Sequence, residues 1–148
     1  MIMKVRRVRL SDVNAIYGMG RGDFLEEEWF TRPELRWIIA SNPRSCWVME
    51  DDGKLIGARL TCEAWGTTAW GWLIVIRREM RRNHLGALLF DETCRLLKKQ
   101  GMSRIMTDVY VRNKVSVAWH RKMGYRKLGV VKDWFDRGKS AIIFCKDL

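Results

Sequence analysis

Hydrophobic and polar positions follow two different periods along the chain, and their alternation predicts an α/β domain. Residues 4–10 alternate apolar and basic side chains, which is typical of a strand with one solvated face. Ser11 and Asp12 then offer caps for a helix on which the apolar positions recur at helical spacing. Residues 24–43 are expected to form one or two short helices, with Pro33 in a first turn.

The middle of the chain predicts the centre of a sheet. Residues 45–63 hold two β-type runs on either side of an Asp-Gly pair, which favours a hairpin. Residues 69–76, AWGWLIVI, are the most continuous apolar run and are expected to form a central strand. A helix begins near Leu85, has leucines at helical spacing, and is expected to stop at Gly101.

The last third of the chain repeats the same kinds of element. The pattern predicts a strand, a helix ended by a glycine, and two further strands joined by a turn, at residues 103–111, 114–124, 125–131 and 140–148. The order β-α-α-β-β-β-α-β-α-β-β indicates one α/β domain over residues 1–148, built around one sheet. No repeat or low-complexity segment divides the chain.

Composition narrows the class of protein. A chain of 148 residues with 47% hydrophobic residues suits a single domain with a core of its own. The first residues lack the apolar region of a secretory signal, so a cytoplasmic protein without membrane contact is expected, as a monomer or homodimer. The four cysteines are scattered, which favours buried free thiols over disulfides or a metal site. The eight tryptophans are expected in the core or in a pocket wall.

The charge balance favours an anionic partner. Lysine and arginine total 28 against 17 acidic residues, which gives a formal net charge of +11. Such a balance fits nucleic acid, a phosphorylated cofactor, an acidic protein surface or the ribosome, and does not choose among them.

A basic turn followed by a glycine and an apolar helix marks residues 81–97, RRNHLGALLFDETCRLL. The N-terminus of a helix presents unpaired N–H groups and partial positive charge, so it suits a phosphate. Gly86 and the arginines before it make a plausible pyrophosphate cradle. A capped amphipathic helix with basic flanks explains the same residues equally well. The P-loop and dinucleotide fingerprints are excluded, because their lysine and glycines are missing.

Two segments resemble the GNAT superfamily of N-acetyltransferases. The stretch WLIVIRREMRRNHLGALLFDE is similar to the acetyl-CoA-binding pattern R/Q-x-x-G-x-G/A, with Arg81 at its first position, Gly86 at its last, and His84 where a glycine is expected. The stretch NKVSVAWHRKMGYRKLG is similar to the family's second element, with His120 at its tyrosine position. The ending DRGKSAIIFCKDL partly resembles that of N-terminal acetyltransferases of ribosomal proteins.

The resemblance implies a GNAT fold and an acetyl-CoA site. The fold would be a mixed, mostly antiparallel sheet of about six to seven strands flanked by about four helices. Acetyl-CoA would contact the central strand, the basic loop and the following helix, and the second motif, at Ile74, Val75, Ile76, Arg81, Arg82, Asn83, His84, Leu85, Gly86, Ala87, Asn113, Ser116 and Trp119. The histidine at position 84 predicts weaker or altered gripping of the phosphates, because the family glycine lets the backbone approach them. Asn113 also suits a helix cap.

Acyl transfer to an amine needs a base for the amine and a proton for the departing thiolate. The resemblance places Asp108 at the position of the base, with Glu63 as its rival, and His120 at that of the acid. A surface aspartate paired with an arginine, and a histidine packed beside the cofactor, are the simpler interpretations. No metal is expected.

The predicted activity is acetyl-CoA-dependent N-acetylation of a primary amine on a protein N-terminus or lysine. A small-molecule amine or amino-acid acetyltransferase is the alternative enzyme, indicated by the histidine. A basic nucleic-acid or ribosome-binding module without chemistry is the alternative of another class. An acceptor amine could be held by acidic and aromatic side chains, at Glu26, Glu27, Glu28, Trp29, Trp134 and Phe135, although the three glutamates also suit a solvated helix start.

Overall fold

A computed structural model describes residues 2–20 and 29–148. The strands of this part of the chain are β1 Met3–Arg7, β2 Cys46–Asp51, β3 Lys54–Trp65, β4 Thr68–Ile76, β5 Arg104–Tyr110, β6 Arg126–Asp136 and β7 Lys139–Asp147. The helices are α1 Val13–Gly20, α2 Arg32–Ser41, α3 Leu85–Lys99 and α4 Lys114–Lys122, with short 3-10 turns at Leu10–Asp12 and Arg78–Met80. None of these helices is long and apolar enough to span a membrane.

The strands form one sheet in the order β1-β2-β3-β4-β5-β7-β6. Neighbouring strands are antiparallel except for β4 and β5, which run parallel. The apolar run of residues 69–76 lies in β4, the middle strand of the seven, as its composition predicts. The mixed, mostly antiparallel sheet expected from the family resemblance is therefore confirmed.

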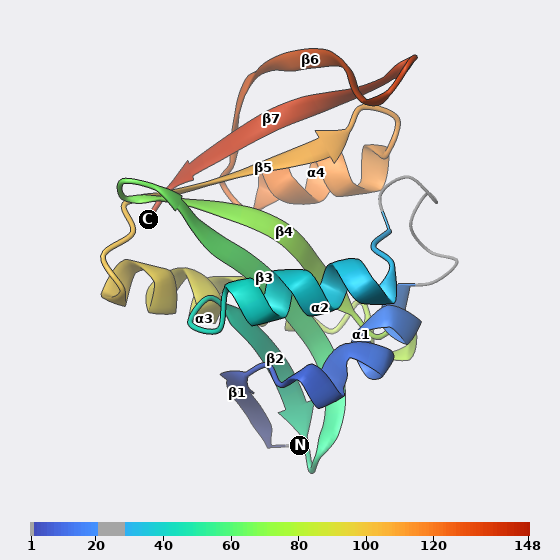
Figure 1. Ribbon diagram of the computed structural model, residues 1–148, viewed down its shortest axis with the longest axis vertical. Helices are drawn as coiled ribbons and strands as arrows, with labels where there is room; N and C mark the ends of the chain where they lie inside the picture. The colour runs from blue at the N-terminus through green and yellow to red at the C-terminus, as the bar shows by residue number, and fades with distance from the viewer. Residues whose placement is uncertain (1, 21–28) are drawn as a thin grey trace.

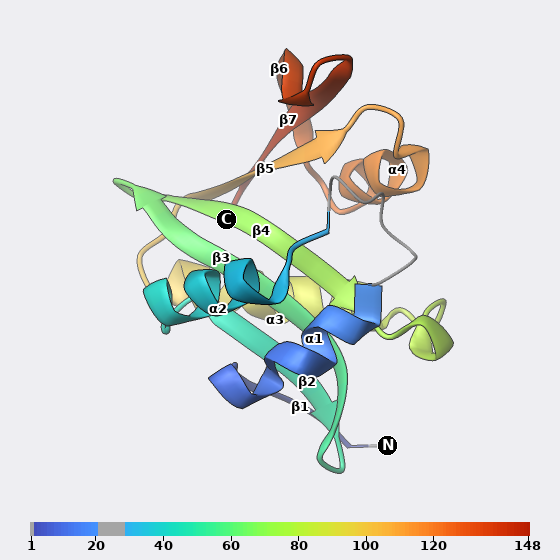
Figure 2. The same cartoon turned by 45° about the vertical axis from the view of Figure 1, so that its right-hand side comes forward.

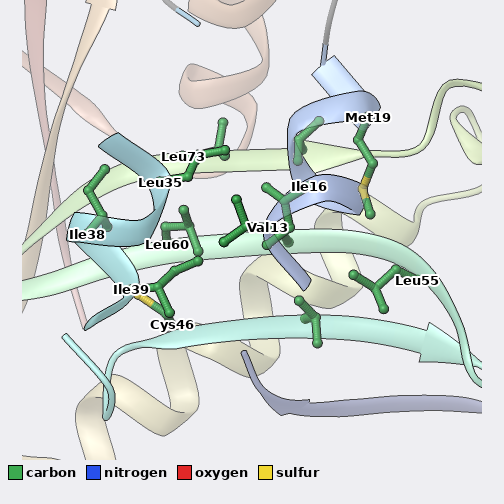
Figure 3. Close-up of a cluster of buried hydrophobic side chains, with 13 residues drawn as sticks. Val13, Ile16, Met19, Leu35, Ile38, Ile39, Cys46, Leu55, Leu60 and Leu73 are labelled. Carbon is green, nitrogen blue, oxygen red and sulfur yellow. The ribbon is translucent and has the colours of Figure 1, made fainter. Parts of the chain in front are cut away.

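Helices cover both faces of the sheet. Figure 1 shows α1 and α2 in front of the strands, and α3 and α4 behind them. The core under α1 and α2 contains Ile16, Leu35 and Leu60, all fully buried, and Figure 3 shows side chains from both helices meeting those of β2, β3 and β4. A second core lies under α3 and α4, around Phe90 and Phe144.

Local sequence signals explain several element boundaries. Thr31 and Glu34 form a capping box at the start of α2, which satisfies two backbone donors of the first turn. The hairpin between β2 and β3 turns at Asp52 and Gly53, both with positive φ, as a two-residue turn between twisted strands requires.

The entry to α1 is held by a partly buried ion pair. The Arg6 guanidinium donates to both carboxylate oxygens of Asp12, at 2.9 and 3.1 Å, and also to Glu50 of β2 at 2.8 Å. The Arg9 N–H donates to Asp12 at 2.7 Å, so the aspartate caps this turn as predicted. Burial raises the pKa of Asp12, but the hydrogen bonds from Arg6 and Arg9 outweigh it, and the net pKa is lowered.

Two strand boundaries and the burial of two cysteines differ from the sequence expectations. The first strand ends at Arg7, because residues 10–12 turn into the 3-10 segment that leads to α1. The strand expected at 125–131 continues to Asp136, where it pairs with the last strand. Cys46 and Cys145 are buried free thiols, whereas Cys62 and Cys94 are only partly buried.

Candidate active site

The two parallel strands separate halfway along their length. Residues 68–71 of β4 pair with residues 104–107 of β5, and the Thr107 hydroxyl donates to the Gly71 carbonyl at 2.8 Å at the end of this ladder. Beyond this point the strands diverge, as Figure 2 shows. In the part of the chain that the structure describes, the divergence leaves the β5-facing edge of residues 72–76 without a neighbouring strand, so the sheet opens at this point.

A cavity of about 890 Å³ occupies this opening. Its lining comes from both faces of the sheet, because residues of α2 and of α4 both contribute to it. A cavity of this size suits a substantial organic ligand. The opening therefore joins the two faces of the sheet in one site.

A bulge shapes the β4 side of the opening. Leu60 of β3 is opposite Leu73, and Thr61 is opposite Gly71, so Trp72 is an additional residue in β4. A bulge re-aims the backbone locally and often lies beside a functional site. Of the predicted contact residues on this strand, Ile74 lines the cavity, whereas Val75 is buried in the core under α1 and α2, and Ile76 in a third cluster with Leu85 and Leu89 of α3.

The loop before α3 has an unusual backbone. Arg82 and His84 have positive φ values of 65° and 58°, and His84 occupies the N-cap position in the left-handed conformation. Glycine adopts this conformation without steric cost, so the histidine keeps the backbone geometry that a glycine would favour. Its side chain is exposed and makes no capping hydrogen bond. The loop is tied to β4 by Arg81, whose Nε donates to the Ile76 carbonyl at 2.8 Å.

The first turn of α3 presents backbone donors that have no acceptor within the helix. The earliest helical bond runs from the Leu88 N–H to the His84 carbonyl, so the N–H groups of residues 85–87 lack an acceptor within the helix. A Cβ at Gly86 would meet Ile76 at 3.6 Å and Trp119 at 3.9 Å, which are ordinary contacts. The protein itself therefore does not require a glycine there. Residues 81–87 do not line the cavity; they lie beyond it, on the side of Trp119.

The second predicted motif forms the α4 wall of the cavity. Asn113 caps α4, accepting from the Ser116 N–H at 3.2 Å, and both residues line the cavity. The cap that the sequence indicates for Asn113 is confirmed. Trp119 packs edge-on against Phe90 of α3, with ring centroids 5.5 Å apart, and so joins α4 to the start of α3.

His120 is buried among aromatic rings at the cavity wall. It stacks on Phe144 with centroids 5.7 Å apart, and its Nδ1 lies 2.7 Å from the Ser116 carbonyl oxygen. A carbonyl only accepts, so Nδ1 carries hydrogen and Nε2 of the neutral ring is an acceptor. Burial lowers the pKa of His120 to about 4; the Arg59 charge acts in the same direction, and the Ser116 bond opposes both. The neutral ring does not suit the acid role expected for it.

Asp108 is the acidic group that β5 brings into the cavity. Its carboxylate accepts a hydrogen bond from the Trp134 indole at 3.0 Å. Burial raises its pKa, and the bond from Trp134 opposes the shift only in part. The expected rival, Glu63, is half-exposed, does not line the cavity, and lies 3.7 Å from Arg44. Glu63 is therefore placed wrongly for a base, and Asp108 is not the arginine-paired surface residue of the simpler interpretation.

Aromatic side chains form the α2 side of the cavity. Trp70 lies between Trp65 and Trp134, at 6.4 Å from each ring, and Trp72 contacts Phe30 and Trp37 at the same distance. Six of the eight tryptophans line the cavity, the sixth being Trp29, so most are wall and not core residues. Trp29, Trp134 and Phe135, which the sequence offers as an acceptor wall, line the cavity. The three glutamates at 26–28 lie outside the described residues.

Two charged lining residues belong to none of the sequence motifs. Glu34 of α2 belongs to the capping box, and Arg59 of β3 is a single charge within an apolar run. The only signal for Arg59 is that charge at a position whose strand neighbours are apolar. Its burial, 2% exposed, makes it the least expected member of the site.

A sheet opened between parallel strands, with helix donors at one side and a partly buried acid within the cavity, is an arrangement typical of an α/β enzyme. The chain belongs to the acetyltransferase (GNAT) family, whose model matches residues 12–125. It is an acetyl-transferring enzyme of that family, and the fold expected from the sequence motifs is confirmed.

Individual relatives agree with this assignment. A Bacillus subtilis (strain 168) protein, provisionally named a [ribosomal protein bS18]-alanine N-acetyltransferase, is 28% identical over 143 residues, covering 94% of this chain and 91% of its own. The structure of Ard1 from Thermoplasma volcanium superposes with a TM-score of 0.91 at 18% identity, covering 100% and 99% of the two chains. The NatC complex bound to Gag peptide and CoA gives a TM-score of 0.83 at 12% identity, covering 100% and 99%.

Proposed function

We propose that the protein transfers an acetyl group from acetyl-CoA to a primary amine of a protein, at an N-terminus or a lysine. The observation that carries the proposal is the partly buried carboxylate of Asp108 within the opening between β4 and β5. The similarity to a relative named for ribosomal-protein acetylation, and to a complex that holds peptide and CoA, supports the substrate class.

The described residues fit a phosphate-bearing donor. Three backbone N–H groups at residues 85–87 point out of α3 with no helical acceptor, and partial positive charge gathers at this end of the helix. Gly86 adds no side chain in front of them, and Arg82 extends from the exposed loop. These groups would bind the pyrophosphate, while Asn113 and the open edge of β4 would bind the chain that leads to the thioester. Acetyl-CoA supplies the activated acyl group.

The protein groups in the cavity then divide the chemistry. Asp108, with its raised pKa, accepts the proton that the attacking amine must lose, directly or through one water. His120 is neutral and keeps Nε2 as an acceptor, so it orients a donor and does not supply a proton. The aromatic wall around Trp134 excludes water and presents ring faces to a cationic amine.

The test is release of free thiol from acetyl-CoA in the presence of peptides with free amino groups. We expect kcat/KM to rise with pH through a carboxyl pKa above its ordinary range, because Asp108 acts only when ionised. Asp108→Asn keeps the shape of the side chain and an oxygen that can accept from Trp134. It should lower kcat/KM at least about 100-fold and abolish the rise of kcat/KM with pH.

Glu63→Gln is the matched control, since it removes a carboxylate outside the cavity and should leave the rate unchanged. Undiminished turnover in Asp108→Asn would remove the base from the mechanism. Absence of turnover with every peptide and small amine, together with salt-sensitive RNA binding, would instead favour the binding module.

A further inference from the structure

Arg59 is a charged side chain inside the second core. It is 2% exposed, and its guanidinium lies 5.4 Å from the ring centroid of Phe90. Its Nη2 donates to the Tyr125 hydroxyl at 3.3 Å, which is a long bond to a neutral partner. Arginine carries a permanent positive charge and five donors, and these contacts satisfy little of that capacity.

The charge of Arg59 has no counter-ion among the described residues. Within residues 2–20 and 29–148, no carboxylate forms an ion pair with it, and its Nε has no hydrogen-bond partner. Burial of an unpaired charge is strongly unfavourable, so natural cores pair such groups or reserve them for a ligand. Arg59 is thus a charge that the fold keeps at a cost in stability.

The surroundings of Arg59 reinforce its positive potential. Lys146 of β7 lies 5.9 Å from the same Phe90 ring, so two cations flank it. The titratable groups that face Arg59 are otherwise His120 of α4, Cys94 of α3 and Tyr125, all neutral at ordinary pH. No group of this set supplies a negative charge.

The fold also keeps room for the guanidinium at the cavity. A Cβ on Gly71 would lie 3.0 Å from Nη2 of Arg59, so a larger residue in β4 would push the side chain aside. Gly71 is the last β4 residue paired with β5, where the two strands begin to separate. Arg59 lines the cavity at this position together with Thr107 and His120.

We propose that Arg59 stabilises the thiolate that departs when the acetyl group is transferred. The inference rests on the proposed function. The amine nitrogen forms a bond to the thioester carbonyl carbon, the carbon–sulfur bond breaks, and its electron pair stays on sulfur as a thiolate. The proton lost by the amine passes to Asp108. The thiolate pairs with the guanidinium and takes its proton from water on release. This assigns to a fixed charge the role expected of an acid at position 120.

Titration of the bound CoA thiol is the first test, because it requires no turnover. Thiolate absorbance is followed against pH, with desulfo-CoA on the same variant as the blank for the protein's own thiols. We expect the bound thiol of the wild type to have a pKa about one to three units below that of free CoA. Arg59→Lys should keep most of this shift and Arg59→Met should abolish it. An equal thiol pKa in the wild type and Arg59→Met would overturn the proposal.

Stability and rate together separate this role from a structural one. Replacement of an unpaired buried charge by Met should leave the melting temperature of the free protein equal or higher. The single-turnover rate should nevertheless fall about 100-fold, with KM for acetyl-CoA nearly unchanged, because the contact forms only as the thiolate develops. Arg44→Met removes an exposed charge and should change neither quantity. A melting temperature lowered in proportion to the lost rate would indicate a structural arginine.

Two further measurements, of acyl-CoA preference and of CoA binding without turnover, distinguish this role of Arg59 from its alternatives. Preference of the wild type for succinyl-CoA over acetyl-CoA, reversed in Arg59→Met, would overturn the proposal in favour of a carboxylate on the acyl group. If CoA binds with a lowered thiol pKa but no amine is acetylated, the assignment of the thiolate partner stands and the proposed acceptor class fails.

Discussion

Substitution of His84 by glycine should stabilise the protein. His84 has φ 58° and ψ 12°, a left-handed conformation that costs an L-residue about 1–2 kcal/mol. Glycine removes this cost but adds about 0.5–1 kcal/mol of conformational entropy to the unfolded chain. The exposed imidazole makes no capping hydrogen bond that the change would remove. The net expectation is a gain of about 0.5–1 kcal/mol in the free energy of unfolding, or about 2–3 °C in Tm.

Urea unfolding of the free protein measures this difference, and His84→Ala is its control. Alanine also lacks the ring but retains the left-handed cost, so it should give no gain. A destabilised His84→Gly beside an unaffected His84→Ala would show that the backbone at position 84 is not left-handed in solution. Equal stabilisation of both variants would instead show that the imidazole ring, and not the backbone, is unfavourable.

Calorimetric titration of the same variants with acetyl-CoA tests the prediction that His84 weakens binding of the cofactor phosphates. We expect His84→Gly to bind more tightly than the wild type, because no side chain then flanks the approach to the helix donors. An affinity unchanged within about twofold, well below the tenfold step of 1.4 kcal/mol, would make the side chain irrelevant to binding.

Two further substitutions separate folding from binding. Gly86→Ala should raise the free energy of unfolding by up to about 1 kcal/mol, because the added methyl meets only ordinary contacts. The same substitution should weaken acetyl-CoA binding at least about tenfold. An unchanged affinity in the calorimetric titration would place the phosphates elsewhere. Asp12→Asn should lower the free energy of unfolding by about 2 kcal/mol at neutral pH, because it removes the carboxylate charge that pairs with Arg6. Because the pKa of Asp12 is lowered on folding, this difference should vanish as pH falls through that pKa, and a pH-independent difference in urea unfolding would contradict the ion-pair account.

Periodicity predicts most elements of this fold because each strand and helix buries a definite set of side chains. The helix at Leu85–Lys99 and the hairpin at Asp52–Gly53 follow from local pattern alone. The bulge at Trp72 does not, because a continuously apolar strand carries no alternation that an additional residue would interrupt. The separation of β4 from β5 is likewise invisible, since it depends on strands that are distant in sequence.

The site shows the same division between local and distant causes. The family resemblance points to the helix donors and to Asp108, and the glycine position in the motif corresponds to the left-handed backbone at His84. The chemical state of His120 depends on its burial beside Arg59 and on a carbonyl one turn earlier, so the residue type alone does not determine its role. Arg59 belongs to no motif. The feature that distinguishes it is a buried charge without a counter-ion among the described residues, and this depends on neighbours that are distant in sequence.

The sheet consists of two halves, which are joined by the short parallel ladder between residues 68–71 of β4 and residues 104–107 of β5. A ligand in the opening would contact both halves of the sheet and would bridge the part of β4 and β5 where the two strands do not pair. Its binding energy then adds to the cohesion of the whole sheet, since a molecule bound only by the folded state raises stability by mass action. We therefore expect the free energy of unfolding to be higher when the site is occupied than when it is empty.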